Sequence, residues 1–473
     1  MYKTFTFLFL FASIINWSFS QENHYWAVEQ GAYATLIGGA AVADVTSQGA
    51  SFYNPGFSPF LDSSGISANS STAFLNVINI ENGAGTNIDL SNTSFSFIPQ
   101  SLAGVVKKPK NDRWTTSYSI INYQYSNYKL NIKHRDTSNL IVETQEDEEY
   151  LAGYSYRNLN REDWAGIAVG YQLTEHFGIG LSTFLVVKTI DYIQNWDASV
   201  SGFNDSLNFY RVLATSSYSE NIDYASLGAL WKLGLAYNTS KFRLGLTITS
   251  PLVNLNIFAK ATVSRDLLFT LDDPSITNQK AITFQEKINT RNRKPLNVDF
   301  GAAYSFKNST LSIRLGYFSK VKKYSLLHEE ELESFSENFD TTISFAVPKM
   351  AHKPVLNFGI GLRQHISEDL DFLLGFRTDF NYFDPDALDQ LTDFVPSIDY
   401  WDLYHVSTGV AWRINSIIFV VGTSYTFGRS KGDQQLVNLS DPKLETLLFG
   451  ERQFNTSTQV NRFNIHLGFL TSF

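Results

Sequence analysis

The amino-acid sequence predicts an all-β membrane protein, an antiparallel transmembrane β-barrel of about 14 strands. Three observations favour this fold class. The 473-residue chain is rich in aromatic residues, with 38 Phe and 24 Tyr, yet its mean hydropathy is only −0.14. Apolar residues alternate with polar residues and glycine over many short stretches. Short polar turns join these stretches in pairs, and alternation of this kind hides the hydrophobicity of a barrel from any window average.

The start of the chain has the pattern of a secretory signal peptide. Lys3 supplies a positive charge, an apolar run covers residues 5–15, and Ser20 closes a small-residue cleavage site. The apolar run is shorter than the ~20 residues that a membrane-spanning helix needs. We therefore expect residues 1–20 to be removed, so that the mature chain begins at Gln21.

The composition argues against several classes of protein. The chain has no cysteine, which removes both a disulfide framework and a lipid-anchored lipoprotein. Its net charge of −9 argues against a nucleic-acid partner. The eight histidines lack ligand spacing, so we expect no metal and no cofactor. His405 and Ser407 share one strand face, but no G-x-S-x-G motif exists, and we expect no catalytic residues and no enzymatic activity.

The strand, turn, strand unit is clearest around a predicted turn at residues 174–176. Ile167 and Val169 fall on one face of the preceding stretch, and Gly166 and Gly170 fall on the other. The same pattern recurs along the chain and gives an even number of strands, as in bacterial single-chain barrels. The predicted strands cover residues 70–81, 92–106, 113–126, 163–173, 177–190, 227–237, 242–258, 296–306, 310–321, 355–364, 370–382, 403–413, 416–428 and 461–473.

Six short turns lie at one end of the predicted barrel, and long polar segments lie at the other. This asymmetry is typical of outer-membrane barrels, with short turns in the periplasm and long loops outside. The last strand ends on Phe473, a terminal aromatic residue of the kind that marks a barrel for the outer-membrane assembly machinery. We therefore expect a multi-pass protein of the bacterial outer membrane, in contact with outer-membrane lipid. The expected outer loops cover residues 127–163, 194–226, 259–294, 323–353, 383–401 and 429–459.

The face predicted to line the lumen is polar and rich in glycine. Glycine weakens a solvated strand, so its abundance favours a wall that another stretch of backbone approaches closely. Arg314 and Arg377 lie on this face, and each could hold the carboxylate of a bound ligand. The alternative is that the two arginines pair with Asp299, Asp371 or Asp379 along the wall.

A stretch of small residues follows the predicted signal peptide. It reads GAAVAD at residues 39–44, and FYNPG follows at residues 52–56. Later stretches read PQSLAG at residues 99–104, LGLTITSP at residues 244–251 and DFGAAY at residues 299–304. In this order they resemble the FadL-type outer-membrane transporters of long-chain fatty acids and other hydrophobic compounds. The resemblance covers most of the mature chain.

The resemblance implies that residues 21–65 form a hatch, or plug, in the lumen and that residues 66–473 form the barrel. In such transporters the outer loops capture a hydrophobic ligand, which passes the hatch and leaves through a lateral gap. A kink in an early strand makes that gap, and residues 114–128 contain no Gly or Pro to produce one here. We expect five residues of this hatch to have a structural role. Among them, Asp44 is expected to accept hydrogen bonds or to pair with a lumenal arginine. These residues are Gly39, Asp44, Asn54, Pro55 and Gly56.

Two functions remain open at this point. The first is uptake of long-chain fatty acids or similar hydrophobic compounds by a plugged barrel. The second is a hatch-bearing barrel that serves as an adaptor subunit of a Bacteroidetes-type protein secretion system. A diffusion porin is a poorer fit, since it needs an open lumen. An apolar pocket of fatty-acid length beside the hatch would favour transport, and a tightly filled lumen would favour the adaptor.

Overall fold

The structure is a computed structural model. It describes residues 23–45, 49–61, 63–107, 113–141, 148–204, 209–255, 258–272, 278–328, 345–388 and 393–473. The predicted signal peptide lies outside the described residues, so its removal stays a prediction. None of the described helices is long and apolar enough to cross a membrane.

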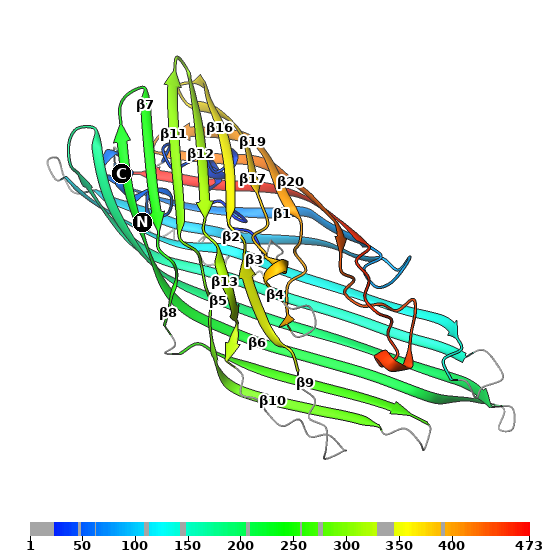
Figure 1. The fold of residues 1–473 in the computed structure, drawn as a ribbon. Coiled ribbons are helices and arrows are strands. Elements are labelled where there is room, and N and C mark those ends of the chain that lie inside the picture. The colour runs from blue at the N-terminus through cyan, green and yellow to red at the C-terminus, as the bar shows by residue number, and fades with distance from the viewer. Residues whose placement is uncertain are drawn as a thin grey trace, which may run out of the picture.

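Fourteen strand positions close into one antiparallel barrel (Figure 1). Each strand pairs with the next along the barrel, and β1 pairs with β21 to close the ring. The predicted fold class and strand number are therefore confirmed. The barrel strands are β1 (Gly65–Glu81), β2 (Leu90–Lys107), β3 (Trp114–Ser138), β4 (Glu148–Gln172), β5 (Phe177–Asn204), β6 (Phe209–Asn238), β7 (Phe242–Thr249), β11 (Asn297–Phe306), β12 (Ser309–Phe318), β16 (Val355–Ser367), β17 (Leu370–Asp379), β19 (Asp402–Ile414), β20 (Ile417–Asp433) and β21 (Thr456–Ser472).

The remaining strands lie toward the end of the barrel that carries the long loops, which we call the loop end. β9 pairs with the upper part of β6, and β10 pairs with β9, so the wall continues beyond the interruption at Pro251. Two small pieces, β8 and β14, complete this extension, and β13, β15 and β18 form a separate small sheet. These strands are β8 (Val253–Asn254), β9 (Lys260–Leu271), β10 (Gln279–Thr290), β13 (Val321–Ser325), β14 (Leu327–His328), β15 (Val347–His352) and β18 (Asp393–Phe394).

The opposite, short-turn end of the barrel has the predicted form. Five of the six predicted short turns lie within the described residues, at residues 173–176, 239–241, 307–308, 368–369 and 415–416. Three of the expected outer loops, in contrast, are wrong, because most of their described residues extend β3 to β6, β9 and β10 (Figure 1). On the inner face of the barrel wall, these extensions carry buried aromatic side chains such as Tyr128, Tyr154 and Tyr192. The outward faces of the same stretches are polar, and this polarity led to the prediction of loops. The corrected ranges are residues 127–163, 194–226 and 259–294.

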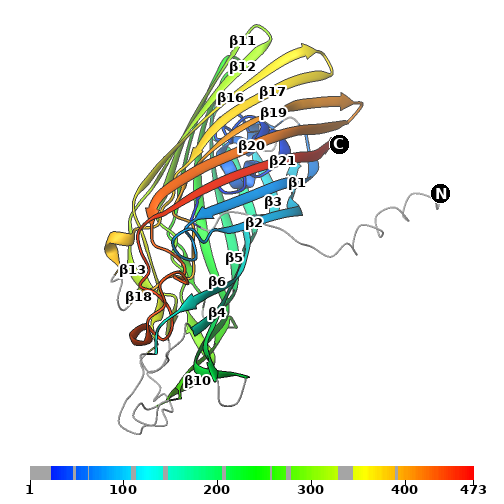
Figure 2. The same cartoon turned by 90° about the vertical axis from the view of Figure 1, so that its right-hand side faces the viewer.

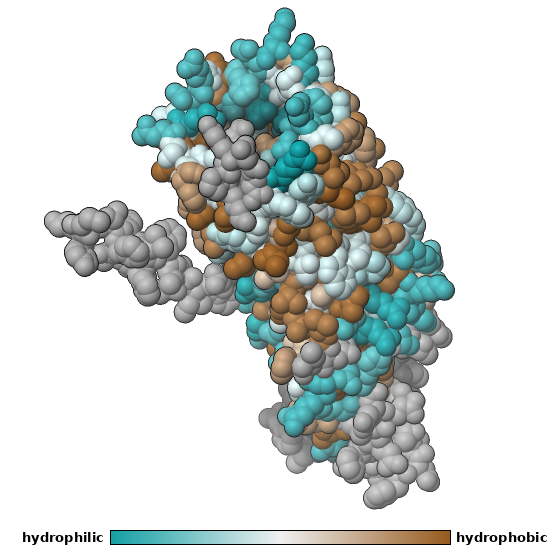
Figure 3. Space-filling model, turned by 90° about the vertical axis from the view of Figure 1, so that its left-hand side faces the viewer, coloured by the Kyte–Doolittle hydropathy of each residue, from teal (hydrophilic) through white to brown (hydrophobic). Residues whose placement is uncertain are grey.

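An apolar belt covers the outward faces of the strands toward the short-turn end. Exposed leucine, valine and aromatic residues lie there side by side, and Figure 3 shows part of this belt in brown. A closed barrel with such a belt is the architecture of outer-membrane proteins. At the end of β21, the Phe473 backbone N–H donates to Ser64 O at 3.0 Å, and the Phe473 side chain is exposed. Members of the belt include Leu181, Phe300, Val410, Phe419 and Phe469.

The described residues of 23–61, which we call the N-terminal segment, lie inside the barrel (Figures 1 and 2). Helix α1 contacts β17, β19, β20 and β21, while α2 contacts β3 and β4, and η1 contacts β4, β5 and β6. The segment therefore touches the wall on several sides. Its helices are α1 (Ala32–Leu36), α2 (Ala50–Tyr53) and η1 (Pro55–Phe60), and two short turns of 3₁₀ helix, η2 (Pro385–Ala387) and η3 (Leu444–Thr446), lie in the loops.

The glycine-rich lining of the lumen has a packing reason. A Cβ atom added to Gly180 would lie within 3.0 Å of Pro55, and one added to Gly375 would lie within 3.0 Å of the Gly38 backbone nitrogen. Real Cβ atoms essentially never approach so closely. The backbone of the N-terminal segment thus lies directly on the wall, and the expected close approach of a second backbone is confirmed.

Candidate functional site between the N-terminal segment and the wall

Glu29 of the N-terminal segment joins the two arginines that the sequence marked as ligand contacts. Arg314 donates from Nη1 to Glu29 Oε1 at 3.3 Å and from Nε to Asp299 Oδ1 at 2.9 Å. Arg377 Nε lies 3.8 Å from Glu29 Oε1, and its Nη2 donates to Trp26 O at 3.1 Å. The structure thus brings both arginines to the same acid. Arg314 also forms one of the predicted wall pairings, with Asp299. A ligand contact for either arginine stays a prediction.

Tyr53 completes the surroundings of Glu29. Its hydroxyl donates to Glu29 Oε2 at 2.7 Å and accepts from the Gln30 backbone N–H at 2.8 Å. Burial, together with the neighbouring Glu29 carboxylate, raises the pKa of Tyr53 well above its usual value, so the hydroxyl stays protonated and donates. Sequence reasoning missed Glu29. The available signal was an isolated acid in a segment expected to lie in a lumen that carries arginines.

Asp44 lies between two arginines of the wall. Its Oδ1 is 2.9 Å from Arg243 Nη2 and 3.6 Å from Arg363 Nη2, and its Oδ2 accepts from Ser312 Oγ at 3.2 Å. Its position fits the structural role expected for it. Gly39 has a φ of +70°, and a Cβ there would collide with the Glu29 carboxylate, so this glycine makes room for the buried acid.

The Asn54-Pro55-Gly56 turn begins the 3₁₀ helix η1 and fixes it to the wall. The Gly56 backbone N–H donates to Asn54 Oδ1 at 2.9 Å, which caps the helix start. Asn54 Nδ2 donates to Leu235 O of β6 at 2.9 Å. A Cβ on Gly56 would lie 2.8 Å from Gly234 O. The turn therefore serves packing between the segment and the wall.

An aromatic pocket with two lysines lies between the N-terminal segment and the wall. Lys232 Nζ donates to Phe52 O at 2.9 Å and lies 4.0 Å from the centroid of the Phe52 ring. Lys294 Nζ lies 2.8 Å from Glu162 Oε1 and 4.5 Å from the centroid of the Tyr123 ring. Such cation–π contacts suit a desolvated ammonium group. Trp26, Phe52, Tyr123, Trp164, Lys232, Lys294, Asp299 and Arg314 are among the lining residues.

The space beside the N-terminal segment is small. The aromatic pocket has a volume of about 30 Å³, and two further cavities against the segment measure about 20 and 40 Å³. Each holds roughly one to four waters, at ~10–15 Å³ for each water. Each of these three cavities is far too small for a fatty-acid chain, so the segment and the wall pack closely where they meet.

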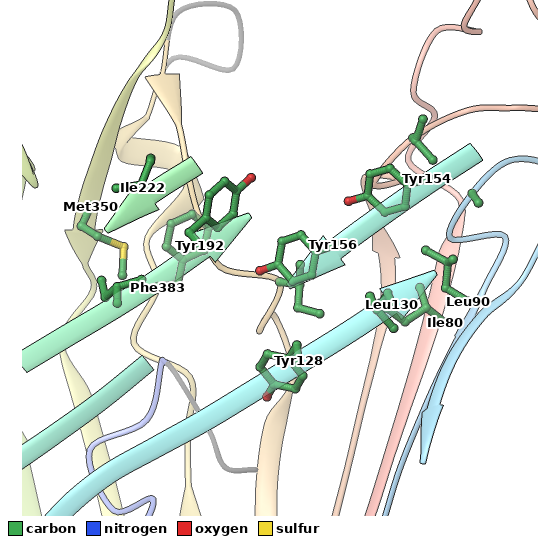
Figure 4. Close-up of a cluster of buried hydrophobic side chains, with 14 of the residues drawn as sticks. Ile80, Leu90, Tyr128, Leu130, Tyr154, Tyr156, Tyr192, Ile222, Met350 and Phe383 are labelled. Carbon is green, nitrogen blue, oxygen red and sulfur yellow. The ribbon is translucent and has the colours of Figure 1, made fainter. Parts of the chain in front are cut away.

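A much larger cavity lies at the loop end. Its volume is about 340 Å³, which falls in the range of ~300–1,000 Å³ usual for small-molecule sites. Figure 4 shows Tyr154 and Tyr156 on one strand, Tyr192 on another, and Phe383 from a loop. The Tyr156 hydroxyl donates to Pro396 O at 2.7 Å, which ties that loop to the strand. We call this space the loop cavity; its aromatic lining comprises Tyr154, Tyr156, Tyr192, Phe383, Tyr400 and Phe454.

The wall is split between β2 and β3. Their pairing runs from Lys107↔Thr115 to Ser101↔Ile121 and stops there, although β3 continues to Ser138 in contact with β4. At this level β3 has a bulge at Tyr123, between its pairs to β4. β3 has no Gly or Pro at this bulge, but Pro99, which has no backbone N–H, lies on β2 just beyond the last pair. The cavity of about 20 Å³ lies just inside the split, lined by Ser101 and Ile121 among others.

Comparison with known proteins relates this geometry to solved barrels. No protein-family model and no curated protein sequence matches the chain. The crystal structure of a Pseudomonas aeruginosa FadL homologue is similar at a TM-score of 0.57 and 12% identity, over 96% of this chain and 100% of that one. The Pseudomonas putida toluene transporter TodX is similar at a TM-score of 0.54 and 13% identity, over 94% and 99%. The CymD monoaromatic hydrocarbon channel is similar at a TM-score of 0.50 and 11% identity, over 94% of this chain and 98% of that one.

At sequence identities this low, the similarity to these structures shows a shared fold. The chain has the FadL-type fold along nearly its whole length, which confirms the resemblance read from the sequence at that level.

Proposed function

We propose that this barrel is an outer-membrane channel for hydrophobic compounds, with the loop cavity as its uptake site. The observation that carries the proposal is this cavity of about 340 Å³, lined by six aromatic residues on a FadL-type fold. Solved barrels of the same fold are described as a toluene transporter and a monoaromatic hydrocarbon channel. An apolar cargo gains ~0.8 kcal/mol for each methylene group that leaves water, so an aromatic cavity favours its capture.

The N-terminal segment is the gate in this proposal. It packs directly on the wall, and the three spaces described beside it measure about 40 Å³ or less. A cargo larger than a few waters therefore passes only if the segment moves. The Glu29 contacts with Arg314 and Arg377 are the charged part of the closed position.

The split between β2 and β3 is the proposed lateral exit. It opens in the strand region that carries the outward side chains of Phe95 and Phe97, which are both exposed. Exit at this level takes an apolar cargo from the protein interior directly into lipid. A polar pore offers an apolar tail no such path.

The lysines of the aromatic pocket favour a cargo with a carboxylate, such as a long-chain fatty acid. Lys232 is buried, and within the described part of the chain it makes no ion pair. An ammonium group has three donors, and Lys232 uses one of them on Phe52 O. A carboxylate entering this pocket would supply the missing acceptor and the missing charge. Arg314 and Arg377 stay in the proposal as further cationic contacts once the gate opens.

Ligand binding by the purified barrel tests this function. We expect native mass spectrometry to find a co-purified fatty acid or similar lipophile, and titration to show binding of oleate. Lys232→Met should weaken oleate binding about tenfold, because one charge-assisted hydrogen bond is lost. Toluene binding should not change. Lys241→Met, in an exposed turn, is the matched control.

The same titrations with Arg314→Ala and Arg377→Ala separate a ligand contact from a purely structural pairing. A ligand contact predicts weaker oleate binding with unchanged toluene binding. If the parent protein holds no lipophile and binds neither oleate nor toluene, the channel function is wrong.

The adaptor function is a second candidate, and the close packing of the N-terminal segment on the wall is the observation that favours it. A structural partner subunit of a secretion system needs no path through the barrel. In that case the parent protein would bind no lipophile and would purify in a fixed ratio with a subunit of the secretion apparatus.

A further inference from the structure

A second group of cationic and imidazole side chains is buried between the N-terminal segment and a different set of strands. It lines the cavity of about 40 Å³, which has room for about three waters. The wall side of this cavity comes from β1, β2, β17, β19, β20 and β21, so it does not overlap with the lysines of the aromatic pocket. The group consists of Arg377, Arg462, His405 and His466.

Arg462 is the main unexplained charge of this group. Its side chain is 5% exposed, and its Nε donates to Asn76 Oδ1 at 3.3 Å. Its Nη2 has no hydrogen-bond partner, and the described residues give it no ion pair. Arginine stays charged in proteins, and a charge inside a barrel usually has a partner.

His466 presents a further donor to the cavity. Ser424 Oγ accepts from Asn464 Nδ2 at 3.3 Å, so its own O–H is available for His466 Nε2 at 2.8 Å. When the Ser424 hydroxyl donates to Nε2, the imidazole proton lies on Nδ1, which has no partner. The resulting N–H is a buried donor without an acceptor, which is costly unless something accepts from it.

His405 and Arg377 add two more nitrogen atoms without hydrogen bonds. His405 Nδ1 is 2.7 Å from Thr426 Oγ1, while its Nε2 has no hydrogen-bond partner and lies 4.0 Å from Asp379 Oδ2. Arg377 Nε likewise has none.

Two carboxylates lie near this group, and one of them, Asp379, has an Oδ2 atom without a hydrogen-bond partner. Glu29 is the one carboxylate among the residues that line the cavity, and it is shared by Arg314, Arg377 and Tyr53. Neither carboxylate forms an ion pair with Arg462 among the described residues. Four nitrogen atoms without hydrogen-bond partners therefore face a space for about three waters, against one unpartnered acceptor, Gln100 Oε1.

We propose that this cavity binds one small anion, either a free halide-sized ion or the carboxylate headgroup of a lipophile. Arg462 and His466 are the principal donors, and Arg377 and His405 complete the site. This site does not depend on the proposed transport, because an anion here would stabilise the packing of the N-terminal segment even in an adaptor.

Anomalous diffraction from crystals of the parent barrel grown in sodium bromide tests the site directly. A bromide peak within hydrogen-bond distance of Arg462 Nη2 and His466 Nδ1 supports a free anion. Elongated density with its headgroup in the cavity, unchanged by bromide, supports a lipophile carboxylate. Native mass spectrometry should then find a fatty acid that is lost in Arg462→Met. Ordered water alone in the cavity overturns the proposal.

Thermal unfolding gives a second readout that needs no crystal. The parent Tm should rise by several degrees when sodium chloride replaces sodium gluconate at equal ionic strength, since gluconate is too large for the cavity. Arg462→Met should remove that difference, and Arg413→Met, at an exposed position of β19, should keep it. An equal response to the two salts in the parent, with no lipophile bound, contradicts the proposal.

Discussion

The two ends of the lumen differ in what fills them. At the level of the apolar belt, the N-terminal segment lies directly on glycines of the wall, and Glu29 holds buried arginines. At the loop end, long strands and loops surround an aromatic cavity of about 340 Å³. The first region suits closure and the second suits binding. Transport through this molecule would therefore depend on movement of the first region, while capture of a cargo requires no movement of it.

Replacing Glu29 should have the largest effect on this contrast. Glu29→Ala leaves Arg314 and Arg377 without their shared acid, and removing one partner of a buried ion pair costs about 3–5 kcal/mol. Hydrogen exchange of the described residues of 23–61 should accelerate by about two to four powers of ten, while the strands around the loop cavity keep their protection. Glu175→Ala, in an exposed turn, is the control. Unchanged protection of the N-terminal segment would contradict a charged contribution to closure.

Substitution of a wall glycine should have the second-largest effect on the packing of the N-terminal segment. In Gly180→Val the new side chain meets Pro55 within 3.0 Å, and overpacking of this kind costs about 1–3 kcal/mol. We expect faster hydrogen exchange in residues 49–61 and a measurable ion conductance in planar bilayers. Leu181→Val changes the lipid-facing neighbour and should behave like the parent. A closed, fully protected Gly180→Val barrel would show that the segment does not need this close approach.

A substitution at the loop end should have a smaller effect and should not change the N-terminal segment. Tyr156→Phe removes the hydrogen bond to Pro396 O, worth about 0.5–1.5 kcal/mol. Hydrogen exchange should increase in the described loop residues 393–401 and stay constant in the N-terminal segment. If both regions respond together, the lumen is one cooperative unit, and the contrast between its two ends is lost.

The sequence predicted the barrel well because alternation and short turns are local features. It also predicted an occupied lumen, since the glycines of the wall report a neighbouring backbone. It missed the upper strands, where aromatic side chains such as Tyr154 and Tyr192 are buried beneath polar outward faces. It missed the split beside β3, because the kink was expected from a Gly or Pro in residues 114–128 only, while the proline at the split is Pro99 of β2.

The candidate site was harder to predict for a different reason. Alternation places Arg314 and Lys232 on the same inward face, and nothing in the sequence tells which one is neutralised. That depends on Glu29, more than 200 residues away in the chain, which supplies an acid to Arg314 and leaves Lys232 without one. Charge pairing across the lumen is set by the closed barrel, and no local pattern encodes it.

If cargo passes only when the N-terminal segment moves, a reversible cross-link between the segment and the wall should stop uptake. Ser51 Oγ of α2 and Ser119 Oγ of β3 are 2.9 Å apart, and the chain has no cysteine of its own. In Ser51→Cys/Ser119→Cys, oxidation should reduce oleate uptake to less than about a tenth of the parent rate, because a disulfide fixes the two elements together. Reduction should restore uptake, and Ser51→Cys alone should be insensitive to oxidation. Full uptake with the disulfide completely formed would show that cargo passes without movement of the N-terminal segment.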